Sequence, residues 1–175
     1  MLGLGTSTVK GGPAKRLVGT YTSDFTGGGG DNSSGWSGSS IQGTLTLATN
    51  QTIDGTSGWL KGTFDTEQTD TNILLELDDP GFTISSGMAT EISYKIYIVD
   101  DSNKWGSSPP ITHRFYYASK WVHASVDYDT TTSLSGNNTA GASSAVYINF
   151  GPGGDLPLAG AVFYVKDIVY TVHSM

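Results

Sequence analysis

The groupings of residues that could suggest acid–base or metal chemistry are few, and their spacing does not suit it. They are two carboxylate pairs, Asp78–Asp79 and Asp100–Asp101, and three histidines, His113, His123 and His173. A glycosidase needs two carboxylates that face each other across a cleft. Adjacent residues at the end of a strand point apart, and Asp is favoured at turns for its local hydrogen bonds. The histidines have no metal-ligand spacing. The sequence therefore predicts a protein that is not an enzyme.

Aromatic side chains offer a different kind of site, because a sugar packs its C–H bonds on the flat face of an exposed ring. The candidates are Trp36, Trp105, Tyr116 and Tyr117. Trp105 lies in the polar segment "DDSNKWG", and we expect its ring to be exposed or buried against a partner. One of the neighbours Tyr116 and Tyr117 must lie on the face away from the core. Trp59 and Trp121 are expected in the core.

The segment Ala161–Val172, "AVFYVKDIVYTV", is an apolar stretch with Lys166 and Asp167 at its centre. Read by alternate positions, both faces are apolar apart from that centre. A strand with one face in water alternates cleanly between apolar and polar residues. This pattern predicts a strand that is covered on both sides, by the N-terminal arm or by another subunit.

The composition restricts the class of partner. The 175 residues suit one domain. Nine Lys and Arg against 16 Asp and Glu give a formal charge of −7, which argues against a nucleic-acid surface and against an anionic membrane. There is no Cys, so neither a disulfide nor a thiolate metal site is expected. No apolar stretch resembles a signal peptide or a membrane span.

Short strand patterns separated by turn residues predict an all-β fold. Segments such as "GTLTLAT" and "EISYKIYIV" alternate apolar and polar residues, and no segment has a helical period. We expect an antiparallel β-sandwich of about eight to nine strands over residues 17–175, preceded by an extended N-terminal arm, 1–16. The Gly- and Ser-rich segments "TGGGGDNSSG" and "DTTTSLSGNNTAGASS" are predicted as loops.

The order of four motifs resembles that of the jelly-roll carbohydrate-binding modules, which have a galactose-binding-like sandwich. They are "LVGTYTSDFTGGGGDNSSGWSG", "ISSGMATEISYKIYIVD", "ASKWVHASVDYD" and "AVFYVKDIVYTV". The resemblance covers Leu17 to Val172 and implies a jelly-roll fold with no catalytic role of its own. It also implies that Trp36 occupies a structural position.

The resemblance implies a possible Ca²⁺ site, which this chain alters. The family commonly binds a structural Ca²⁺ through a Glu of the first motif and an Asp of the last, but Thr26 and Lys166 stand at those positions here. Asp24 and Asp167 remain as candidate ligands. Three arrangements are open: a retained Ca²⁺, an internal Lys166–Asp167 ion pair in its place, or a solvated lysine beside an aspartate at a β-bulge. We predict no cofactor other than this possible Ca²⁺.

Two functions from different classes agree with these patterns. The first is a structural protein of a bacteriophage virion, a capsid decoration (cement) protein similar to other small sandwiches with terminal arms. It would act as a homo-oligomer, a trimer, that binds the major capsid protein or other virion subunits. The partner-binding candidates are Leu2, Leu4, Val9, Trp105, Tyr116 and Tyr117.

The second function is a carbohydrate-binding module, or a tail-associated protein that binds host glycans. Its candidate residues are Trp105, Tyr117 and Trp36. The resemblance favours this alternative, and the two functions are compatible because a virion protein can also bind a glycan.

Overall fold

The structure is a computed structural model that describes most of the chain. The residues described are 15–23, 25–27, 36–40, 45–66, 73–77, 80–101, 104–105, 111–117, 120–141, 146–150 and 157–175. These contain strands and no helix, and so no helix long and apolar enough to cross a membrane. The strands are β1 (Arg16–Thr22), β2 (Trp36–Ser40), β3 (Leu45–Ile53), β4 (Thr56–Phe64), β5 (Ile73–Leu77), β6 (Ala89–Ile98), β7 (Ile111–Tyr117), β8 (Lys120–Val126), β9 (Thr132–Thr139), β10 (Val146–Phe150) and β11 (Val162–Ser174).

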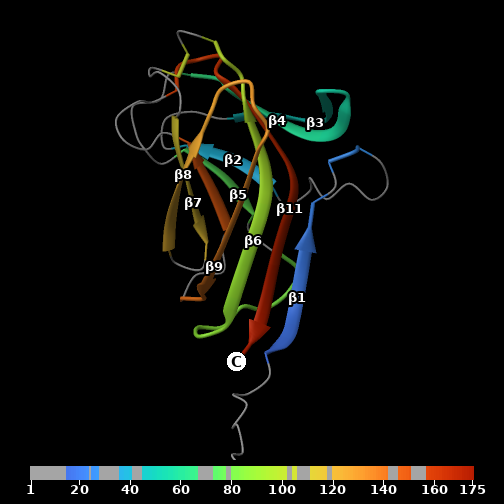
Figure 1. Ribbon diagram of the computed structural model, residues 1–175, viewed down its shortest axis with the longest axis vertical. Coiled ribbons are helices and arrows are strands. Elements are labelled where there is room, and N and C mark those ends of the chain that lie inside the picture. The colour runs from blue at the N-terminus through green and yellow to red at the C-terminus, as the bar shows by residue number, and fades with distance from the viewer. Residues whose placement is uncertain are drawn as a thin grey trace, which may run out of the picture.

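The strands form two packed antiparallel sheets, which confirms the predicted β-sandwich (Figure 1). Sheet A has the order β3-β4-β11-β6-β9, with β1 also paired to β11, and sheet B has the order β2-β5-β10-β7-β8. Eleven strands are described, more than the eight to nine expected. One expected loop, 129–144, contains a strand, β9, and the other, 26–35, is followed directly by β2. The eight residues of β9 pair in full register with β6 despite their Ser, Gly and Asn content, because pairing with a neighbouring strand overrides the weak strand propensity of such residues.

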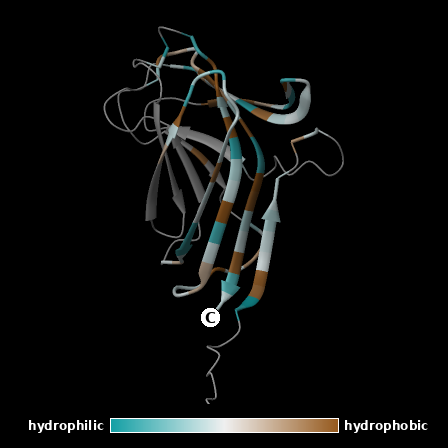
Figure 2. Ribbon diagram, in the orientation of Figure 1, coloured by the Kyte–Doolittle hydropathy of each residue, from teal (hydrophilic) through white to brown (hydrophobic). Residues whose placement is uncertain are grey.

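Large aromatic side chains fill the space between the sheets. Tyr94, Tyr170, Phe64 and Phe163 are fully buried, and hydrophobic and hydrophilic residues alternate in bands along β6 and β11 (Figure 2). Gly62 on β4 lies opposite Phe163 on β11, and a Cβ at that position would come within 2.2 Å of the phenyl ring. Gly62 therefore makes room for a ring that covers its backbone, the cross-strand arrangement known to compensate for glycine in a sheet.

A β-bulge explains the pattern of β11. The register with β6 shifts between Lys166 and Val169, and Asp167 has a φ of +52°, a left-handed value that Asp tolerates better than most residues. Before the bulge the buried residues are Phe163 and Val165, and after it they are Ile168, Tyr170 and Val172. The buried positions thus change from odd to even, so the apolar residues of both apparent faces point into one core. The expectation that a second apolar face needed its own cover is therefore wrong.

The bulge also marks a change of partner. On one side β11 pairs along its whole length with β6, while on the other it pairs first with β4, at 162–165, and then with β1, at 169–174 (Figure 1). Ser23, just after β1, joins the two segments. Its N–H donates to the Ile168 carbonyl at 2.9 Å, and its hydroxyl oxygen accepts from the Ile168 N–H at 2.9 Å. The Ser23 hydroxyl is thereby the acceptor for the Ile168 N–H, which the bulge removes from the regular hydrogen bonding of the sheet.

We predict that Ser23→Ala destabilises the protein. The variant leaves the Ile168 N–H without its acceptor in a buried site, which costs about 1–3 kcal/mol of the free energy of unfolding. Urea denaturation followed by circular dichroism measures the loss. Ser135→Ala, at an exposed position of β9, is the control and should change the free energy by less than about 0.5 kcal/mol. Equal stability of the two variants would contradict this role for Ser23.

Candidate functional site

The outer face of sheet B carries a row of residues suited to sugar binding. Positions along a strand alternate between the two faces of a sheet. Leu75 on β5 and Val126 on β8 are buried, so the positions next to them in the alternation belong to the outer face. The register then aligns four such positions, each opposite the next, across β5, β10, β7 and β8: Glu76, Tyr147, Tyr116 and Trp121. We call these four positions the transverse row.

The transverse row runs across the strands and is long enough for several sugar units. Neighbouring strands lie about 4.8 Å apart, so four strands span about 14 Å. Ser37 on β2 is opposite Glu76 and extends the row to about 19 Å. Three aromatic positions and one carboxylate position in line provide the two kinds of group that a glycan uses, a ring for its C–H faces and an acceptor for its hydroxyls.

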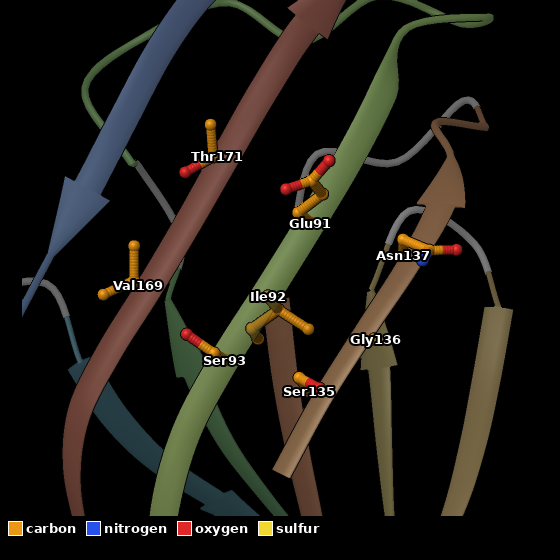
Figure 3. A pocket seen from close by; sticks show the side chains of 8 residues that line it. All are labelled: Glu91, Ile92, Ser93, Ser135, Gly136, Asn137, Val169 and Thr171. Atoms are coloured by element: carbon orange, nitrogen blue, oxygen red, sulfur yellow. The ribbon is translucent and has the colours of Figure 1, made fainter.

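Sheet A has a different outer surface. A groove of about 440 Å³ crosses β6, β9 and β11 there (Figure 3). Polar side chains dominate its wall, and Figure 3 shows Glu91, Ser93, Asn137 and Thr171 beside the apolar Val169. The described lining contains no aromatic ring and a single carboxylate. This groove therefore lacks both a stacking platform for sugars and the pair of carboxylates that glycoside hydrolysis requires.

Trp105 does not provide an exposed ring. It is 4% exposed and packs edge-on against Phe64, with ring centroids 5.6 Å apart. The main chain around it is fixed by two hydrogen bonds of Lys104, whose N–H donates to the Asp101 carbonyl and whose carbonyl accepts from the Leu158 N–H. The expectation that Trp105 forms a sugar platform or a partner contact is wrong, because a large apolar ring gains more from the core than from a polar loop.

Trp36 is likewise a structural residue, as the family resemblance implied. It is 6% exposed, and its indole N–H donates to the Tyr21 hydroxyl at 2.6 Å. The two rings also meet edge to face, with centroids 6.2 Å apart. This contact joins β1 of sheet A to β2 of sheet B. Trp36 is therefore removed from the set of sugar-binding candidates.

The register of β7 with β8 assigns Tyr116 and Tyr117 to opposite faces of sheet B. Tyr116 is opposite Trp121 and takes an outer position, whereas Tyr117 shares its alternation with Ile111, which is opposite the buried Val126. The transverse row therefore includes Tyr116 and not Tyr117. Trp121, which we expected in the core, also holds an outer position.

The charged residues at the centre of β11 take two separate partners. The Asp167 carboxylate forms an ion pair with Lys95 on β6 at 2.8 Å, and the Lys166 ammonium donates to the Ser57 carbonyl on β4. The expected Lys166–Asp167 ion pair is replaced by these two contacts. The β-bulge of the third alternative is confirmed, but its lysine is bonded to the β4 backbone and not merely solvated. Asp24, Leu2, Leu4 and Val9 lie outside the described residues, so their predicted roles stay predictions.

Two tyrosines of β6 have raised pKa values. Burial raises the pKa of Tyr94 well above 10.0. The pKa of Tyr97 is raised mainly by burial and further by the Asp129 carboxylate, which accepts a hydrogen bond from its hydroxyl at 3.1 Å. Both phenols are thus held in the neutral form, and the Tyr97 hydroxyl acts as a hydrogen-bond donor. Among the described residues, no group of three or more His, Asp or Glu could hold a metal.

Comparison with known proteins gives a match only at the level of structure. No family description and no curated protein matches the sequence. The xylan-binding CBM22-1 domain of Paenibacillus barcinonensis Xyn10C is 14% identical, with a TM-score of 0.51 over 93% of this chain and 97% of that domain. BiXyn10A CBM1 is 13% identical, with a TM-score of 0.55 over 91% and 99% of the two chains.

A third similar structure contains a ligand. The CBM22-1 and GH10 modules of Clostridium thermocellum Xyn10B, complexed with xylohexaose, are 14% identical, with a TM-score of 0.51 over 90% of this chain and 28% of that one. The chain has the jelly-roll fold of carbohydrate-binding modules. At these identities the likeness shows the fold alone, and this jelly-roll fold confirms the architecture that the order of motifs implied.

The sequence contained a signal for the transverse row that our reading missed. In "AVYINF" the apolar Val146, Ile148 and Phe150 alternate with Tyr147 and Asn149, which is the pattern of a strand with one polar, aromatic face. The alternation does not say which residues lie beside Tyr147. The pairing of β10 with β5 and β7 gives them, because it aligns Tyr147 with Glu76 and Tyr116.

We predict that the Trp36–Tyr21 contact stabilises the sandwich and takes no part in ligand binding. Trp36→Phe and Tyr21→Phe each remove one partner of the hydrogen bond, at a cost of about 0.5–1.5 kcal/mol. Because both lose the same bond, the double variant should lose less than the sum of the single losses. A double-mutant cycle by urea denaturation measures this coupling, and additive losses would contradict it.

Proposed function

We propose that this chain is a non-catalytic carbohydrate-binding module whose ligand is an extended glycan lying along the transverse row. The register that aligns Glu76, Tyr147, Tyr116 and Trp121 carries this proposal. Sugar rings would stack on the aromatic positions, and Glu76 would accept hydrogen bonds from sugar hydroxyls. The jelly-roll fold supports the proposal, since the similar structures include a xylan-binding domain and a module complexed with xylohexaose.

The absence of a second carboxylate in the transverse row favours binding over hydrolysis. Glu76 is the only acidic position among its four residues. The row could hold and orient a chain of sugars, but it has no partner group that would protonate a leaving oxygen while Glu76 attacks or activates water.

We predict that Trp121→Ala and Tyr147→Ala each weaken binding to the best glycan by at least about tenfold, equivalent to about 1.4 kcal/mol, because each removes one stacking ring. Affinity gel electrophoresis with soluble xylan, glucomannan and mixed-linkage β-glucan identifies the ligand and ranks the variants.

The matched control is Tyr164→Ala. Tyr164 lies on β11 in the other sheet, edge to face with Tyr97, so its loss should leave retention in the gel unchanged. Circular dichroism confirms that each variant folds. The proposal fails if none of the three polysaccharides retards the wild-type protein, or if both row variants are retarded as strongly as the wild type.

A second proposed function is the virion decoration role, in which the 1–16 arm binds neighbouring subunits. One observation favours it: Leu17 and Val18 at the start of β1 are 57% and 38% exposed. These apolar side chains directly follow the arm, and β1 pairs only with β11 among the described strands. An apolar strand next to an arm is suited to contact with another chain.

For this second function we predict that the full chain forms oligomers and that deletion of residues 1–14, which leaves β1 intact, makes it monomeric. Light scattering coupled to size-exclusion chromatography measures the mass of both forms. Leu17→Ser tests the contribution of the exposed strand, and Thr20→Ser on the same strand is the control. A full-length chain that stays monomeric at high concentration would end this proposal without affecting the glycan proposal.

A further inference from the structure

Four segments of the chain meet at the Lys166 side of the β11 bulge. They are the turn 25–27, the irregular part of β3 near Asn50, the start of β4 at Ser57–Gly58, and Lys166 itself. The Asn50 N–H donates to the Phe25 carbonyl at 2.6 Å, which fixes the turn against β3. A Cβ at Gly58 would lie 3.6 Å from Thr26 and 3.8 Å from the Lys166 ammonium nitrogen. Thr26 and Lys166 thus converge on one point of the β4 backbone.

These two residues stand at the positions where the resembling family places carboxylate ligands of a structural Ca²⁺. The described groups at this point do not fit that ion. Ca²⁺ takes six to eight oxygen ligands, whereas this site presents the Ser57 carbonyl to a lysine ammonium. The described part of the chain has no group of three acidic or histidine side chains that could hold a metal.

The Asp167 carboxylate is directed elsewhere by the same bulge. Lys166 on β11 is directly opposite Lys95 on β6, and like charges in that position repel. The bulge relieves this by bringing the Asp167 carboxylate to Lys95, at 2.8 Å, while the Lys166 ammonium donates to Ser57 on the opposite neighbour, β4. A cation bound by Asp167 would have to compete with the Lys95 ion pair.

We infer that the Lys166 ammonium is the resident cation of this sandwich and that the fold is complete without a divalent metal. The ammonium is held by a covalent tether and donates to the β4 backbone beside Thr26 of the 25–27 turn. It therefore joins the centre of β11 to the start of β4, next to the 25–27 turn. Its stabilising effect does not depend on the metal content of the medium.

Thermal unfolding with and without metal tests this inference. The wild-type protein should have the same midpoint in EDTA and in excess CaCl₂, and isothermal titration of CaCl₂ should give no binding heat. Lys166→Met, which keeps the length of the side chain, should lower the midpoint by about 2–4 °C in both media. Lys61→Met, on the outer face of β4, is the matched control and should lower it less.

Two results would overturn the inference. One is a wild-type midpoint that rises with CaCl₂ or falls in EDTA, which would show that a divalent ion still takes part in the fold. The other is a Lys166→Met variant as stable as Lys61→Met. The wild-type measurement decides the question even if Lys166→Met does not fold.

Discussion

The reciprocal hydrogen bonding between Ser23 and Ile168 is the contact on which the arrangement of sheet A depends. It lies where the pairing of β11 changes from β4 to β1, so that β11 has two successive partners along the same edge. The bulge that makes this possible would leave a buried N–H without a partner, and the Ser23 hydroxyl supplies one. The bulge also places the side chains of Lys166 and Asp167 against different strands, β4 and β6. It shifts the alternation of β11 by one residue, so that Phe163 and Tyr170 both lie in the same core.

The sequence was sufficient for the architecture and less so for the local irregularities. Alternation in segments such as "EISYKIYIV" correctly indicated half-buried strands, and the order of motifs pointed to the jelly roll. The bulge at Lys166–Val169 could not be seen, because a phase shift within an apolar strand looks the same as a strand with two apolar faces. Trp105 was misplaced for a related reason: the polarity of its neighbours in sequence does not report what packs on the ring in space, which is Phe64.

The two outer faces of the sandwich differ in what they could bind. The outer face of sheet A has a groove lined by hydroxyl, amide and carboxylate groups, such as those of Glu91 and Asn137. A ligand that binds these polar groups must first displace the water that hydrates them. The face of sheet B has aromatic positions in register, and rings gain from removing apolar surface from water. The candidate site could not be assembled from the sequence alone because it is a property of pairing: Glu76, Tyr147 and the hairpin pair Tyr116–Trp121 are far from one another along the chain and become neighbours only when β5, β10 and β7 pair.

The pairing of β1 with β11 has a consequence for folding. Arg16 is opposite Ser174, so the two partners are separated by almost the whole sequence. Loop closure over such a distance is slow, and on the ribosome β1 must wait until β11 emerges. Until then β6 lacks its central neighbour, and its apolar side chains, such as Ile92 and Ile96, remain uncovered. Between the emergence of β6 and that of β11 the nascent chain is thus exposed to aggregation, which makes it a natural client for chaperones that bind apolar strands.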